Sequence, residues 1–225
     1  MKRRLFLPVG RCSAPATSGF TLVELLVVIA IIAVLMAMLL PALARGREKA
    51  KVARAHGELH CIALALDMYS SDNQGRLPPV RVNCNTDLRT HWCELPVELA
   101  QQHYLGTSTN AGMAANVQDI FNPSHTYKYA APGPQLLNGR PTQDYKLWVP
   151  DDFPTCASTN GQYYSDPKTT PVRWVVWSLG PQPDGPRSQN TYAPMANWSW
   201  YCSAGGGGVI ACFAGQDGTQ YTTPF

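Results

Sequence analysis

The sequence predicts an α+β protein in which one long N-terminal helix packs against a C-terminal antiparallel β-sheet domain with a loop-rich insertion. Three observations lead to this fold class. An uncharged apolar run extends from Leu25 to Leu40, and a stripe of apolar residues at helical spacing follows it. The last third of the chain contains runs of β-branched and aromatic residues separated by glycine and proline turns.

The first 19 residues form a basic segment for which no fold is predicted. Four of the 18 lysines and arginines precede Gly19, with none of the 15 acidic residues, so the rest of the chain has a net charge of −1. A cationic segment before an apolar run stays on the cytoplasmic side of a membrane. The rest of the chain is near neutral, and its charge implies no nucleic-acid partner.

Residues 20–40 are long enough and apolar enough to cross a membrane. At about 1.5 Å rise per residue, a helix of this length spans roughly 30 Å, the thickness of a bilayer core. Glu24 is the one carboxylate in this run, and a charge at such a depth is costly and marks function. Pro41 closes the run and is expected to kink or locally open the helix. A signal peptide is the alternative interpretation, but the composition changes before the apolar run and not after it.

Beyond Pro41 the helix is expected to continue in water to about Ser71. Its first half is rich in lysine and arginine, and its second half carries one apolar stripe at spacings of three and four, namely Leu59, Ile62, Leu66 and Tyr69. This stripe should pack on the sheet of the globular domain. Polar residues with Gly75 and then two prolines end the helix. We therefore expect a leader over residues 1–19, a helix over 20–74 and a globular domain over 75–225.

The middle of the chain offers fewer periodic signals. Residues 95–104 predict a short helix, with a proline near the first turn. Residues 116–152 are dominated by loop-forming residues, with one candidate strand at 145–149. We interpret this stretch as an insertion on the surface of the domain.

Two β signals follow. Residues 171–179 alternate apolar side chains on both faces and form the clearest strand. Residues 198–202 and 209–213 flank four consecutive glycines and predict a β-hairpin. A phosphate-binding loop is the alternative, but no helix with a lysine follows these glycines.

Cysteine usage favours disulfides. Seven cysteines are present, and one lies in the leader, so an even number remains for a domain expected outside the cytoplasm. Proximity favours Cys84 with Cys93, and Cys202 with Cys212. The second pair would lie opposed across the predicted hairpin and would fix its register.

The segment Gly19-Phe20-Thr21-Leu22-Val23-Glu24-Leu25-Leu26, with Pro41 closing the run, resembles the N-terminal region of type IV pilins and type II secretion pseudopilins. The helix that follows looks most like that of the major pseudopilin. The resemblance covers residues 19 to about 79. It implies cleavage by a prepilin peptidase after Gly19, N-methylation of Phe20 and assembly into a type II secretion or type IV pilus-like filament.

The same resemblance implies where the protein works and with what. It implies a single pass through the inner membrane, with the C-terminal domain in the periplasm or outside the cell. The partners would be further copies of itself, other pilin-like subunits, the inner-membrane assembly platform and membrane lipid. Glu24 of one subunit would meet the amine of Phe20 in its neighbour, because a carboxylate in lipid is best satisfied by a cation.

Calcium is the one cofactor that the resemblance suggests. In major pseudopilins a strand similar to residues 171–179 runs into a Ser-x-Gly-x-Asp-Gly turn that belongs to a calcium-binding loop. Here Asp184 is the acid close to that strand, and Asp217 could add a second carboxylate. Calcium takes roughly six to eight oxygen ligands, so two ordinary Asp-Gly turns are the alternative interpretation.

No Ser-His-Asp or paired-carboxylate signature is present, so the sequence predicts no enzymatic activity. The alternative function is a membrane-anchored extracytoplasmic domain that binds carbohydrate or mediates adhesion. Six tryptophans and ten tyrosines would suit stacking on sugars, although aromatic residues in such numbers also build cores.

Overall fold

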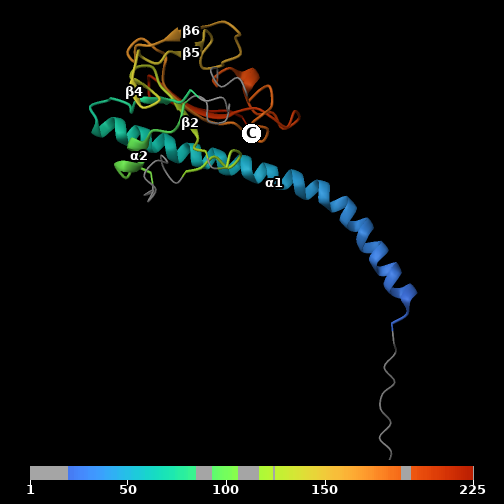
Figure 1. Cartoon of the computed structure of the whole chain (residues 1–225). Coiled ribbons are helices and arrows are strands. Elements are labelled where there is room, and N and C mark those ends of the chain that lie inside the picture. Colours follow the sequence, from blue (N-terminus) through green and yellow to red (C-terminus); the bar gives the residue numbers. More distant parts are fainter. Residues whose placement is uncertain (1–19, 85–92, 106–116, 124, 189–193, 225) are drawn as a thin grey trace, which may run out of the picture. The chain divides into compact units, whose positions relative to one another are not determined.

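The computed structural model describes residues 20–84, 93–105, 117–123, 125–188 and 194–224 (Figure 1). The predicted leader, with the cleavage site at Gly19, lies outside the described residues. The chain divides into two compact units, Met1–Arg45 and Gly46–Phe225. The predicted α+β class is confirmed, since one long helix is followed by a domain built mainly from antiparallel strands.

Helix α1 (Leu22–Asp72) contains 51 residues and continues through Pro41 without a break in secondary structure. The proline ring removes one backbone hydrogen bond at that point. The apolar start of α1 has a mean hydropathy of 3.1 and is the one candidate membrane span in the described part of the chain. Every residue from Phe20 to Arg47 is exposed, so the apolar side chains of this segment are not buried by any described part of the chain.

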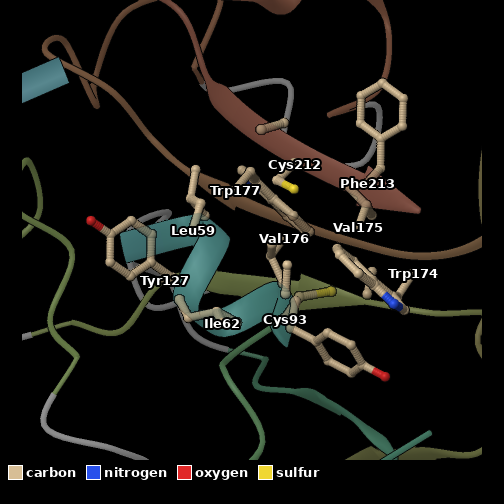
Figure 2. Packing of buried hydrophobic residues seen from close by; sticks show 14 of the residues in the cluster. Leu59, Ile62, Cys93, Tyr127, Trp174, Val175, Val176, Trp177, Cys212 and Phe213 are labelled. Atoms are coloured by element: carbon tan, nitrogen blue, oxygen red, sulfur yellow. The ribbon is translucent and has the colours of Figure 1, made fainter. Parts of the chain in front are cut away.

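The second half of α1 packs against the domain as predicted. Leu59, Ile62 and Leu66 are fully buried, and they belong to one core cluster with the sheet residues. Figure 2 shows Leu59 and Ile62 beside Tyr127 and Trp177. Hydrogen bonds join the same helix to the strands, including one from Arg173 Nη2 to Ser70 Oγ (2.9 Å). The apolar stripe read from the sequence is therefore the face of α1 that meets the sheet.

The main sheet is antiparallel, with the strand order β2-β7-β8-β9. These strands are β2 (Lys128–Ala130), β7 (Val172–Ser178), β8 (Ile210–Gly215) and β9 (Gln220–Thr222). The strand predicted at residues 171–179 is confirmed as β7. It lies between two neighbours and is buried on both faces, because Trp174 and Val176 on one face and Val175 and Trp177 on the other are all fully buried. This double burial explains its continuous apolar sequence.

Two smaller sheets complete the domain. One has the order β1-β3-β4, in which β1 pairs parallel with β3, so the architecture is not purely antiparallel. The other pairs β5 with β6. The bounds are β1 (Val80–Val82), β3 (Gln135–Leu137), β4 (Arg140–Pro141), β5 (Leu147–Pro150) and β6 (Gly161–Tyr164). A short helix, α2 (Val97–Gln101), lies within the predicted helix at 95–104, and a 3-10 turn, η1 (Asn197–Ser199), precedes β8.

The interpretation of residues 116–152 as a surface insertion is wrong for its central part. Strand β2 lies in the main sheet beside β7, and both Tyr127 and Tyr129 are fully buried. Each phenol finds an acceptor, since Tyr127 donates to Glu58 Oε2 (2.6 Å) and Tyr129 to the carbonyl of Pro78 (2.9 Å). Large aromatic rings supply the apolar area that this polar-looking segment lacks in aliphatic residues.

The predicted hairpin around the four glycines is also wrong. Strand β8 is paired with β7 on one side and with β9 on the other, so residues 198–202 cannot pair with it as a neighbouring strand. They form η1 and two isolated bridges instead, Trp200 with Val209 and Cys202 with Gly207. Gly208 has a φ of +121° and lies against the carbonyl of Trp200, a position that only glycine fits.

Neither predicted disulfide is formed in the structure, in which all six described cysteines have free thiols. Cys202 lies opposite Gly207, whereas Cys212 pairs with Val176 and Thr222 within the sheet. The prediction that Cys202 and Cys212 face each other across a hairpin is therefore wrong, because residues 198–202 and 209–213 do not form a hairpin.

The thiols of Cys202 and Cys212 differ in reactivity, which gives a first testable prediction. Hydrogen bonds from the backbone N–H groups of Ala204 and Gly205, with a smaller effect of Arg187, lower the pKa of the partly exposed Cys202. Burial raises the pKa of Cys212 to about 12. We expect iodoacetamide at neutral pH to alkylate Cys202 in the folded, non-reduced protein and to leave Cys212 unmodified, because the thiolate is the nucleophile.

Peptide mass spectrometry after timed alkylation measures this difference. A Cys202→Ser variant serves as the control and should lose only the corresponding labelled peptide. Recovery of a peptide in which Cys202 and Cys212 are linked would contradict the arrangement of free thiols.

Candidate functional site

Three reciprocal hydrogen bonds between Thr21 and Glu24 cap the start of α1. The Glu24 backbone N–H donates to Thr21 Oγ1 (3.3 Å), and Glu24 Oε2 accepts from the Thr21 backbone N–H (2.9 Å) and hydroxyl (2.8 Å). This is the capping-box geometry, in which the first free N–H groups of a helix are satisfied by side chains. The sequence analysis missed this cap, although Thr-x-x-Glu before an apolar run is its signature.

The carboxylate of Glu24 uses only one of its oxygens in this cap. The two hydrogen bonds that reach the carboxylate both end on Oε2. Oε1 therefore has no hydrogen-bond partner among the described residues. Phe20, the residue that the predicted cleavage would expose as the new N-terminus, is itself 75% exposed. The site therefore holds a carboxylate in a fixed position and leaves one oxygen available to a cation that comes from elsewhere.

The surface next to this site is apolar all the way round the helix. The large side chains from Leu22 to Leu43 are exposed. The small residues Ala30, Ala33 and Ala37 recur among them at spacings of three and four. Such a surface is stable in lipid or against other apolar helices, and small residues let helices approach closely.

The calcium candidates do not come together in a ligand set. Asp217 binds its own turn, with Oδ1 accepting from the Thr219 N–H (3.0 Å) and Oδ2 from the Thr219 hydroxyl (2.7 Å). These hydrogen bonds lower the pKa of Asp217. Within the described ranges no group of three or more His, Cys, Asp or Glu side chains could hold a metal ion. The calcium site at Asp184 and Asp217 thus stays a prediction without support from the geometry.

A carboxylate that the sequence analysis overlooked lies at the end of β7. Asp119 is 1% exposed and accepts hydrogen bonds from Ser178 Oγ (2.7 Å), the Leu179 N–H (3.1 Å) and the Phe121 N–H (3.0 Å). Burial raises the pKa of Asp119, and these hydrogen bonds together with the charge of Lys128 oppose that shift. The loop after β7 is therefore anchored by a carboxylate of the protein, at the place where the resemblance implied calcium.

Comparison with known proteins places the N-terminal region in a recognisable class. Residues 15–40 match the prokaryotic N-terminal methylation motif. This segment covers the predicted cleavage site, the capping box and the apolar start of α1. The chain thus carries a prepilin-type N-terminus, as its resemblance to pilins and pseudopilins predicted.

The curated relatives that match are proteins of type II secretion systems. The type II secretion system core protein G of Pseudomonas aeruginosa is 46% identical over 56 residues, which are 25% of this chain and 39% of the relative. The protein of the same name from Escherichia coli is 38% identical over 84 residues, covering 31% of this chain and 58% of the relative. The chain thus spans less than two thirds of the length of these relatives. No solved structure matches it.

Proposed function

We propose that this protein is a filament subunit of the pseudopilin type that serves type II secretion or a type IV pilus-like system. The observation that carries this proposal is the N-terminal methylation motif over residues 15–40, which includes the exposed apolar start of α1. The name of its relatives, a secretion system core protein, supports the same assignment. The proposal assigns no catalytic activity to the chain.

Processing creates the group that Glu24 requires. A prepilin peptidase cleaves after Gly19 and the amine of Phe20 is then methylated. An α-amine has a pKa of roughly 8 in water, so it is largely protonated at neutral pH. The leader over residues 1–19 is removed, and the helix over 20–74 and the domain over 75–225 remain.

Assembly pairs this cation with Glu24 of an adjacent subunit. In a low-dielectric environment an ion pair with good geometry offsets the cost of burying both charges, and a single unpaired charge does not. The free Oε1 of Glu24 is the acceptor, while Oε2 keeps the helix cap. Ala30, Ala33 and Ala37 let the helices of neighbouring subunits approach closely. Helix packing then provides most of the contact area between subunits, and the ion pair fixes their relative position along the helix axis.

The proposal also assigns a location and partners. The subunit crosses the inner membrane once, with the domain on the periplasmic side, and it contacts lipid, the assembly platform and other pilin-like subunits. The basic leader supports this orientation, since cationic segments remain in the cytoplasm.

Analysis of filaments sheared from cells tests the proposal. We expect mass spectrometry to find this protein in the filament fraction with N-methylated Phe20 as its first residue. A Gly19→Glu variant is the control, because a charged side chain at the cleavage position should keep the leader on the chain. A wild-type chain that retains residues 1–19 in the membrane fraction would contradict the proposal.

A further inference from the structure

The β5–β6 sheet presents an aromatic pair on its outer face. In Figure 1 these strands lie on the side of the domain away from α1. Leu147 and Val149 are buried in the core, so Trp148 between them faces outward, since side chains alternate along a strand. Trp148 is half-buried and lies outside the hydrophobic core formed by the described residues. Its cross-strand partner is Tyr163, which is 61% exposed.

Gly161 fixes the orientation of the Trp148 ring. A Cβ atom built on Gly161 would lie 2.6 Å from both Cε2 and Cζ2 of the indole. No real side chain tolerates that approach, so the ring lies against the backbone of the neighbouring strand because the residue there is glycine. The strand supports the ring from one side and holds it in place beside Tyr163.

The positions around this pair are polar. Lys146 immediately precedes β5 and Ser165 immediately follows β6, so both lie at the ends of the two strands that carry the pair. The exposed amide of Asn160 lies next to Gly161 in the sequence. These groups supply an ammonium, a hydroxyl and an amide, which donate and accept hydrogen bonds.

We propose that Trp148 and Tyr163 form a binding site for a carbohydrate chain. The C–H groups on the flat face of a pyranose ring carry partial positive charge, and they stack on the negative face of an aromatic ring. The hydroxyl groups at the edge of the sugar then bond to the polar side chains beside the pair. A fixed indole loses little conformational freedom when the sugar binds, which favours affinity. This activity is independent of filament formation and would belong to the domain of the subunit.

Titration of the full-length protein with defined oligosaccharides tests this site. Cellohexaose, chitohexaose and maltohexaose are added to the protein in a detergent without a sugar headgroup, and the heat of binding is measured by isothermal titration calorimetry. We expect saturable binding of at least one of the three. Trp148→Ala should weaken that binding by about tenfold, as should Tyr163→Ala, because each removes one stacking surface.

The matched control is Trp198→Ala. Trp198 is 40% exposed and lies in η1, outside the β5–β6 sheet, so its removal should leave the affinity unchanged. Near-ultraviolet circular dichroism checks that each variant is folded. If the Trp148→Ala protein does not fold, the Tyr163→Ala protein alone provides the test. Absence of saturable binding to all three oligosaccharides would overturn the proposal. So would equal affinity in wild type and the folded β5–β6 variants, or an equal loss in Trp198→Ala.

Discussion

Replacing Glu24 by glutamine is expected to abolish filament assembly while the protein still inserts into the membrane. Glutamine keeps an oxygen that can accept the Thr21 N–H, so the helix cap is retained. It loses the negative charge, and the protonated amine of the neighbouring subunit then has no counter-ion in the apolar environment. Removal of one partner of a buried ion pair costs about 3–5 kcal/mol. Immunoblotting of sheared filaments and of membranes measures both outcomes in one strain.

Thr21→Val is the matched control for this experiment. Valine has nearly the shape of threonine but no hydroxyl, so it removes two of the three capping hydrogen bonds and leaves the Glu24 charge in place. A lost cap costs roughly 1 kcal/mol, which should slow assembly at most. Normal filaments from the Glu24→Gln strain would show that the charge of Glu24 is not required. Loss of filaments only in the Thr21→Val strain would show that the helix cap is required instead.

Asp119→Ala is expected to destabilise the globular domain by about 3 kcal/mol, because it leaves several buried hydrogen-bond donors without an acceptor. The substitution leaves the Ser178 hydroxyl and two backbone N–H groups without their buried acceptor. The buried side chain of Lys128 also loses the carboxyl group with which it interacts electrostatically. Urea unfolding of the full-length protein in detergent, followed by the fluorescence of the buried tryptophans, measures this loss.

Asp217→Ala is the control for Asp119, since it removes an exposed carboxylate that binds only its own turn. We expect its unfolding midpoint to stay close to that of wild type. Equal midpoints for the Asp119→Ala and Asp217→Ala proteins would refute the anchoring role of Asp119. Asp119→Asn should fall between wild type and alanine, because the amide oxygen still accepts one of the three hydrogen bonds.

Features with a local cause were predictable from the sequence. The apolar run gives the exposed half of α1, and the spacing of Leu59, Ile62 and Leu66 gives the buried face of its second half. Strand β7 was predictable because it is buried on both faces and is apolar throughout. The capping box is equally local, so Thr21 and Glu24 could have been paired by spacing alone.

Features that depend on distant partners were not predictable in this way. Strand β2 is identified only by its pairing with β7, more than forty residues further along the chain. The hairpin prediction failed for the same reason, because a local glycine signal competed with the long-range pairing of β8. Asp119 meets Ser178 across a separation of 59 residues, and nothing around it forms a motif.

The two oxygens of Glu24 have a consequence for the proposed filament subunit before it assembles. A bare carboxylate would resist entry into the hydrocarbon layer. In this protein the Thr21 hydroxyl and amide already solvate Oε2 from within the same chain. Under the proposed function, a copy that has not joined a filament can therefore reside in the bilayer as a stored precursor, and the supply of subunits need not keep pace with filament growth.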